Sequence, residues 1–169
     1  MQNKSDFKIL AIDDDKDILL LLRYNLESEG YHIETASSGK KGISLAQKSD
    51  PDLILIDIMM PEMDGIQTCI KLREIDNLKS SHILFLTARA EEYSEVAAFD
   101  AGADDYITKP IKPRALISRI NSFYKKTSAK VKSSKSLQVG DLSINKESYV
   151  VELNGKEIFF PKKEFELLH

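Results

Sequence analysis

The sequence is poor in several features that mark particular classes of protein. A single cysteine, Cys69, excludes an internal disulfide and fits a reducing compartment. No apolar run approaches the roughly 20 residues of a membrane-spanning helix. The polar start Met1–Asp6 contains no signal-peptide core. We therefore expect a cytoplasmic protein that does not enter a membrane.

Charge and metal-binding side chains are also limited. The net charge is only −3, so bulk electrostatics predict neither nucleic-acid nor membrane binding. The three histidines, His32, His82 and His169, are far apart and lack metal-ligand spacing. With 42% apolar and 30% charged residues, the chain has the composition of an ordinary globular protein. Its 169 residues suffice for one complete domain and part of another.

The first 125 residues alternate between strand and helix patterns. Strands are predicted at Lys8–Ile12, Ile33–Ala36, Leu53–Asp57, Ile83–Thr87 and Tyr106–Thr108. Helices are predicted at Lys16–Glu29, Lys40–Lys48, Ile66–Glu74, Glu92–Ala101 and Arg114–Tyr124. Such alternation predicts an α/β domain over residues 1–125, a five-stranded doubly wound parallel sheet with helices on both faces.

The composition changes after this domain. Residues 126–136 are rich in Ser and Lys without apolar periodicity, which predicts a flexible linker. Short strand patterns follow at 137–139, 142–144, 149–153 and 157–160, the last two joined by the hairpin signal Asn154-Gly155. A helix is predicted from Pro161, and the sequence given stops about two turns into it. We therefore expect residues 137–169 to be the truncated beginning of a second domain, with partial antiparallel β structure.

The most informative stretch is the third predicted strand and the loop after it. Leu53–Ile56 is continuously apolar, as in a strand buried on both faces, and Asp57 stands at its end. In open α/β folds ligands bind at the carboxyl ends of the strands. Asp57 therefore lies where chemistry is expected.

More carboxylates follow the first predicted strand. Asp13, Asp14 and Asp15 come directly after it, so at least two of them can face the same crevice as Asp57. Carboxylates gathered in this way repel one another, and Mg²⁺, which prefers hard oxygen ligands, would hold them together. Capping of the next helix is the simpler alternative, which we prefer for Asp15 but not for Asp13 and Asp14.

A hydroxyl and an ammonium are predicted at the same sheet edge. Thr87 ends the fourth strand and Lys109 follows the fifth. Together with a nucleophilic carboxylate and Mg²⁺, these groups suit an aspartyl phosphate, because they balance charge on the phosphoryl oxygens.

These motifs closely resemble the receiver domain of two-component response regulators. The matching residues are Asp13-Asp14, the run from Asp57 through Met60-Pro61 to Asp64-Gly65, Thr87-Ala88, and Ala101 to Tyr106 running into Lys109-Pro110. The resemblance implies a flavodoxin-like sheet of strand order 2-1-3-4-5 and a cis Lys109–Pro110 bond. It implies phosphorylation of Asp57 by a sensor histidine kinase. It further implies Mg²⁺ held by Asp13, Asp14, Asp57 and the Met59 carbonyl, phosphoryl contacts from Thr87 and Lys109, and Tyr106 as an aromatic switch.

The tail resembles the opening of the winged-helix effector domain of OmpR/PhoB-type transcription factors. The resemblance implies that a full-length form binds promoter DNA, whereas the recognition helix lies beyond the residues present. It also implies a homodimer on phosphorylation, through helix four, strand five and helix five, with Asp104, Asp105 and Arg119 on the dimer face. Glu95 and Ala115 depart from the usual pattern of that face, so we expect a weakened dimer.

Two other functions fit part of this pattern. A haloacid-dehalogenase-like phosphatase also uses an Asp nucleophile, Mg²⁺, Thr or Ser, and Lys. That family places its nucleophile after strand one in Asp-X-Asp-X-Thr/Val, whereas Asp13 to Asp17 has Asp where Thr or Val belongs. A receiver that acts alone by protein contacts is the other alternative, and the tail after Leu137 argues against it. The favoured function is therefore a phosphorylation switch, not a turnover enzyme.

Overall fold

The structure, a computed structural model, describes residues 3–88, 100–134, 136–139, 142–145, 150–153 and 156–159, with side chains as far as residue 128. The chain divides into two compact units, Met1–Asn121 and Ser122–His169, which are treated separately. Most of the predicted helix Glu92–Ala101, the Asn154-Gly155 turn and the predicted helix from Pro161 lie outside the described residues.

The first unit contains the predicted five-stranded sheet. Its strands are β1 (Lys8–Ile12), β2 (His32–Ala36), β3 (Leu53–Asp57), β4 (His82–Thr87) and β5 (Asp105–Thr108). All neighbouring strands are parallel and the order is β2-β1-β3-β4-β5, which confirms the predicted fold. Every residue of β3 is buried, as expected for a central strand covered on both faces.

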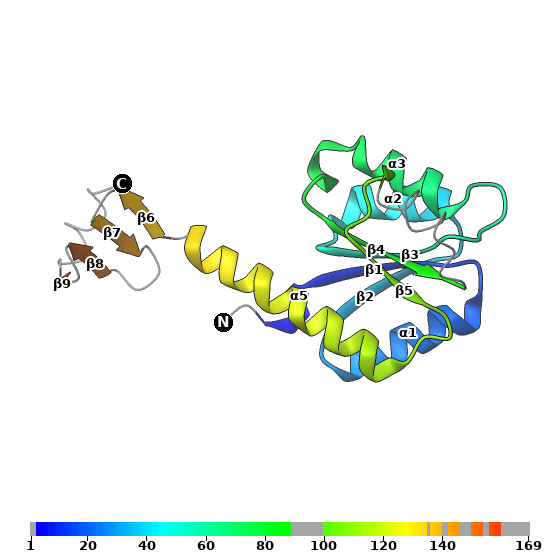
Figure 1. Ribbon diagram of the computed structural model, residues 1–169, viewed down its shortest axis with the longest axis horizontal. Coiled ribbons are helices and arrows are strands. Elements are labelled where there is room, and N and C mark those ends of the chain that lie inside the picture. Colours follow the sequence, from blue (N-terminus) through cyan, green and yellow to red (C-terminus); the bar gives the residue numbers. More distant parts are fainter. Residues whose placement is uncertain are drawn as a thin grey trace. The chain divides into compact units, whose positions relative to one another are not determined.

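Helices cover both faces of this sheet. The helices are α1 (Lys16–Ser28), α2 (Gly39–Ser49), α3 (Gly65–Arg73) and α5 (Pro113–Ser134), and Lys4–Asp6 and Asp76–Leu78 form short 3-10 helices, η1 and η2. Figure 1 shows α1 and the start of α5 on one face, and α2 and α3 on the other. Asp15, Ser38 and Asp64 cap α1, α2 and α3, because the side chain of each accepts a hydrogen bond from a first-turn amide.

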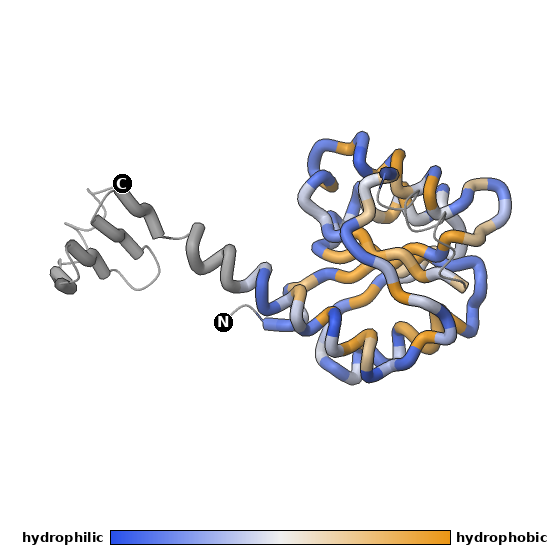
Figure 2. Tube along the Cα trace, in the orientation of Figure 1, coloured by the Kyte–Doolittle hydropathy of each residue, from blue (hydrophilic) through white to orange (hydrophobic). Residues whose placement is uncertain are grey.

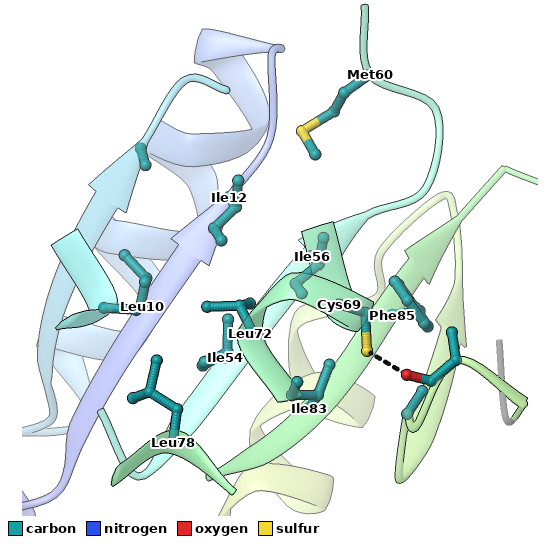
Figure 3. Close-up of a cluster of buried hydrophobic side chains, with 14 residues drawn as sticks. Leu10, Ile12, Ile54, Ile56, Met60, Cys69, Leu72, Leu78, Ile83 and Phe85 are labelled. Carbon is teal, nitrogen blue, oxygen red and sulfur yellow. Dashed lines mark hydrogen bonds between the residues drawn. The ribbon is translucent and has the colours of Figure 1, made fainter. Parts of the chain in front are cut away.

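The core on the α2 and α3 side is almost wholly apolar. Leu10, Ile54, Ile83 and Phe85 are among the buried side chains that fill it, as Figure 3 shows. Figure 2 shows the same division along the chain, with hydrophobic strands inside and hydrophilic segments at the loops and outer helix surfaces. The Cys69 thiol is buried here and donates to the Ala101 carbonyl at 3.3 Å. Burial raises the pKa of this thiol to about 11, so the thiol stays protonated and unreactive at neutral pH.

The prediction of an irregular segment after Tyr124 was wrong. Helix α5 continues to Ser134, so residues 126–134 of the predicted linker are helical. Residues 125–134 contain no Gly or Pro to end a helix, whereas Lys and Ala favour one. The linker prediction rested on missing apolar periodicity, and a helix can form without an apolar stripe.

The second unit contains a four-stranded antiparallel sheet. Its strands are β6 (Ser136–Val139), β7 (Leu142–Asn145), β8 (Val150–Leu153) and β9 (Lys156–Phe159), paired in sequence order. They coincide with the four predicted strand patterns to within about a residue at most boundaries. Within the described residues, no helix is sufficiently long and apolar to cross a bilayer.

Candidate phosphorylation site

Three carboxylates meet at the carboxyl edge of the parallel sheet. One carboxylate oxygen from each of Asp13, Asp14 and Asp57 lies within 4.8 Å of the other two. Asp57 ends β3 and is 4% exposed, whereas Asp13 follows β1 and is fully buried. Asp14 is exposed, so the cluster opens to solvent on one side. The structure thus brings together the three acids that the sequence placed at this edge.

The Lys109 ammonium bridges two of these carboxylates. Its Nζ lies 2.8 Å from Asp13 Oδ2 and 2.8 Å from Asp57 Oδ1. Lys109 follows β5 directly, and its amide donates to the Thr87 carbonyl at 2.6 Å. The Lys109–Pro110 bond is cis, as the sequence resemblance implied. These contacts connect the ends of three strands, β1, β3 and β5, through one side chain.

The charges at this edge do not balance. Three carboxylates and one ammonium give a formal charge of −2 (−3 + 1). Burial raises the pKa of Asp57; the Lys109 hydrogen bond opposes this rise, and the charges of Asp13 and Asp14 add to it. Burial alone would lower the pKa of Lys109, but its hydrogen bonds to Asp13 and Asp57 raise it overall. One bound divalent cation would therefore bring the formal charge of the site to zero.

The loop after β3 holds its shape through a close backbone approach at Gly65. The Gly65 amide donates to the Ile58 carbonyl at 2.9 Å, and a Cβ atom on Gly65 would lie 2.3 Å from the Asp57 carbonyl oxygen. A side chain here would push the start of α3 away from Asp57. Within this loop the Met59 side chain is 75% exposed. No hydrogen bond from the described residues reaches its carbonyl, which leaves that oxygen available as a ligand.

Thr87 and Tyr106 lie on neighbouring strands beside this edge. Asp57 pairs with Leu86, so the buried Thr87 stands one residue farther toward the carboxyl edge. Tyr106 pairs with Phe85 and packs, partly buried, against the core cluster. Both residues therefore lie at the positions that the sequence assigned to them.

The three predicted dimer-face residues make different contacts within the chain. Arg119 Nη1 lies 2.6 Å from Asp105 Oδ1 and also donates to the Tyr106 carbonyl at 3.0 Å. The Asp104 carboxylate instead accepts from Arg73 at 2.7 Å and from the Ile83 amide at 2.8 Å.

Sequence reasoning missed Arg73 entirely. Besides Asp104, its guanidinium donates to the carbonyls of Gly102, Leu78, Lys79 and Ser81. The only sequence signal was a basic residue in the last turn of a predicted helix, which favours the helix dipole but does not indicate such contacts.

The family of receiver domains matches this arrangement along most of the chain. Residues 9–121 match the family described as "Response regulator receiver domain". The chain belongs to the response regulator receiver family. The receiver match covers β2 to β5 and all of β1 except Lys8, and it favours this family over the dehalogenase-like alternative.

Individual relatives extend the similarity beyond the receiver. The chain is 38% identical over 169 residues to the alkaline phosphatase synthesis transcriptional regulatory protein PhoP of Bacillus subtilis (strain 168), covering 95% of this chain and 70% of PhoP. It resembles the crystal structure of response regulator DrrB, a Thermotoga maritima OmpR/PhoB homologue, with a TM-score of 0.63 and 31% identity over 96% of this chain and 70% of DrrB. The chemotaxis protein CheY4 of Vibrio cholerae gives a TM-score of 0.67 and 30% identity over 69% of this chain and 97% of CheY4.

These similarities fix the general role of the chain. It contains the receiver domain of a two-component response regulator, a phosphorylation switch and not an enzyme, and its relatives include OmpR/PhoB-type transcription regulators. A receiver domain implies a cognate histidine kinase. The triad of Asp13, Asp14 and Asp57 is typical of a receiver metal site.

Proposed function

We propose that Asp57 accepts a phosphoryl group from the cognate sensor histidine kinase and that this modification controls transcription by the full-length protein. The observation that carries the proposal is the Lys109 ammonium, which touches Asp57 and Asp13 at 2.8 Å inside an acidic cluster open to solvent. In the transfer, one Asp57 carboxylate oxygen forms a new P–O bond while the bond from phosphorus to the donor breaks. The donor keeps the electron pair of the broken bond.

The chain's own residues hold the groups in place for this step. Asp57 ends a fully buried strand, and its carboxylate lies 2.8 Å from Lys109 Nζ at the sheet edge. Lys109 Nζ lies where it would meet a phosphoryl oxygen as negative charge moves onto Asp57. The Thr87 hydroxyl, one residue beyond the partner of Asp57, would donate to a second oxygen.

We propose Mg²⁺ as the metal. The carboxylates of Asp13, Asp14 and Asp57 and the Met59 carbonyl supply hard oxygen ligands, and the formal charge of −2 matches a divalent cation. When bound, Mg²⁺ would neutralise charge on the phosphoryl oxygens and on the carboxylates that surround them.

The proposed switch passes from Thr87 to Tyr106. A new dianion at Asp57 draws the Thr87 hydroxyl inward, and the partly buried Tyr106 ring turns into the space that is vacated. Such a change is a population shift between two packings. Thr87→Ala should therefore accept phosphate but respond weakly downstream.

The proposed output is promoter binding by a winged-helix domain in a full-length form. The antiparallel sheet β6–β9 supports this, because an initial four-stranded sheet is what the OmpR/PhoB resemblance implies. A cytoplasmic location belongs to the same proposal and is supported by the lone, buried thiol of Cys69.

Phosphoryl transfer to Asp57 can be tested directly with acetyl phosphate and Mg²⁺. The parent chain should acquire an alkali- and hydroxylamine-sensitive label, which chelation of Mg²⁺ should suppress and Asp57→Asn should abolish. Asp64→Asn is the matched control: it alters an aspartate in the same loop, and asparagine can keep the cap on Gln67. Undiminished labelling of the Asp57→Asn chain would refute the assignment.

We also propose a homodimer on phosphorylation, through β5 and α5. Asp105 and Arg119, paired within one chain, can exchange partners across a twofold axis. We rest the interface on these two residues, because Asp104 is engaged by Arg73 and Ile83. A beryllofluoride mimic of the aspartyl phosphate should raise the association constant measured by sedimentation, and Arg119→Glu should reverse that gain. If neither the mimic nor Arg119→Glu changes the association constant, this interface is refuted.

A further inference from the structure

An open groove lies at the carboxyl end of β2, on the free edge of the five-stranded sheet. β2 is the first strand in the sheet order and, among the described residues, pairs only with β1. Two adjoining hollows of about 210 and 500 Å³ flank it and share Leu19 and Thr35. We call these hollows and the edge of β2 the β2 groove. The phosphorylation site lies outside this groove.

The two helices beside the groove carry the same residue pattern. On α1 the lining residues are Lys16, Leu19, Leu20 and Arg23. On α2 they are Lys41, Ser44, Leu45 and Lys48. Both sets follow the spacing i, i+3, i+4, i+7, which places four side chains on one face of a helix over about 10 Å. Each helix face thus presents a cationic side chain at either end and two shorter, mostly apolar side chains between them.

The four cations lack acidic partners. None of Lys16, Arg23, Lys41 and Lys48 forms an ion pair with any residue that the structure describes. The one acid in β2, Glu34, lines neither hollow.

Hydroxyl groups hold two of these cations at the strand edge. Arg23 Nη2 donates to Thr35 Oγ1 at 2.7 Å, and Lys41 Nζ donates to Ser37 Oγ at 3.3 Å. These neutral contacts position the charges over the end of β2 without neutralising them. Leu20, between Lys16 and Arg23 on α1, is 67% exposed, so apolar surface accompanies the charge.

We propose that the β2 groove binds an extended, acidic segment of another protein, which adds to the sheet edge alongside β2. An open edge strand offers backbone groups to an added strand, and flanking side chains select its sequence. Acidic side chains of the segment would meet the cations, and smaller apolar ones would rest on Leu19, Leu20 and Leu45. A second copy of this chain does not fit, because pairing through β2 would bring four cations from each copy together.

The test uses the 169-residue chain and a short, blocked, fluorescent peptide in which Glu alternates with Val. The peptide should bind with salt-sensitive affinity and shift the amide resonances of β2, such as those of Ile33 and Thr35. Replacing every Glu in the peptide by Gln should weaken binding about tenfold or more, because only the charge is lost. Lys41→Glu/Lys48→Glu in the chain should weaken binding by a similar factor.

Lys71→Glu/Lys125→Glu is the matched control, since it makes the same change in net charge at exposed sites outside the groove. It should change the affinity by less than the groove variant does. The proposal fails if both double variants weaken binding equally, or if the Gln peptide binds as well as the Glu peptide. It also fails if inorganic phosphate or a short DNA duplex displaces the peptide from β2. Self-association of the Lys41→Glu/Lys48→Glu chain without peptide binding by the parent would likewise overturn it, because the cations would then only keep the edge strand from pairing with itself.

Discussion

The two ends of the five-stranded sheet each hold a cation next to β5, in very different surroundings. Before β5, the Arg73 guanidinium meets the Asp104 carboxylate and four backbone carbonyls. After β5, the Lys109 ammonium lies between Asp13 and Asp57, with Asp14 beside them. Arg73 contacts one carboxylate, whereas Lys109 contacts two and has a third, that of Asp14, close to both.

This difference distinguishes a contact that only supports the fold from a site that can bind a ligand. At the Arg73 end, the guanidinium charge is matched by the Asp104 carboxylate, and its N–H groups donate to carbonyls. A bound cation would therefore not stabilise that end. At the Lys109 end, burial and then the charges of Asp13 and Asp14 raise the pKa of Asp57, and a bound cation would oppose this rise. One end should therefore respond to Mg²⁺ and the other should not.

The largest expected loss of stability comes from removing the contacts of the Arg73 guanidinium with Asp104 and the four backbone carbonyls. Arg73→Ala leaves Asp104 and several carbonyls without their partner, and we expect a cost of about 2–4 kcal/mol in the free energy of unfolding. Urea unfolding measures this cost, and Mg²⁺ should not recover it. Arg73→Lys serves as the control: it keeps the charge but cannot reach all five acceptors, so it should recover only part of the loss. If the Arg73→Ala variant were as stable as the parent, the contacts of Arg73 would not support the fold.

Binding of Mg²⁺ should change the free energy of unfolding by a comparable amount but should increase it. At a concentration about 100 times its dissociation constant, Mg²⁺ should stabilise the parent chain by about 2.7 kcal/mol. Asp13→Asn should remove most of this gain in thermal unfolding. Asp15→Asn should keep it, because Asp15 lies outside the triad and asparagine can still cap α1. Equal loss in both variants would place the metal elsewhere.

A smaller effect is expected from Lys109→Met in the absence of metal. Three carboxylates would then lack their counter-ion, but the open side at Asp14 admits solvent, so we expect a loss of about 1–3 kcal/mol. Mg²⁺ should recover much of it, since the metal replaces the missing positive charge. Failure of Mg²⁺ to stabilise this variant more than it stabilises Arg73→Ala would break the distinction between the two ends.

Sequence patterns were sufficient for the Lys109 end and not for the Arg73 end. Apolar runs such as Leu53–Ile56 predict buried strands, and residues directly after those strands must meet at one edge. Asp13, Asp57 and Lys109 could therefore be placed together before the structure was known. The strand order that makes these residues neighbours came from the resemblance to receiver domains and not from the patterns themselves.

Contacts made by long side chains to backbone carbonyls leave no comparable trace. Arg73 reaches carbonyls on η2 and on the loops before β4 and β5, and no residue spacing records which carbonyls point toward it. The length of α5 was missed for a related reason. Residues 126–134 have no apolar stripe, so they looked irregular although they contain no Gly or Pro to end a helix.

The smallest effect, and the most direct measure of the imbalance at the Lys109 end, is the stability of Asp57→Asn without metal. Because the folded state raises the pKa of Asp57, folding favours the protonated carboxyl. Ionised Asp57 therefore destabilises the fold. This penalty is absent below the unfolded pKa of about 3.9. It grows as the pH rises and is complete above the raised pKa of the folded state.

The Asp57→Asn substitution keeps the shape of the side chain and removes its charge, so the variant should be more stable than the parent by about 0.5–2 kcal/mol at neutral pH. The difference between variant and parent in urea unfolding should shrink toward zero as the pH falls, because the parent then becomes neutral at Asp57 too. Asp64→Asn, at a capping aspartate outside the triad, should show no such pH-dependent gain. If Asp57→Asn is less stable than the parent at neutral pH, Lys109 compensates Asp57 fully, and the two ends of the sheet are alike in their charge balance.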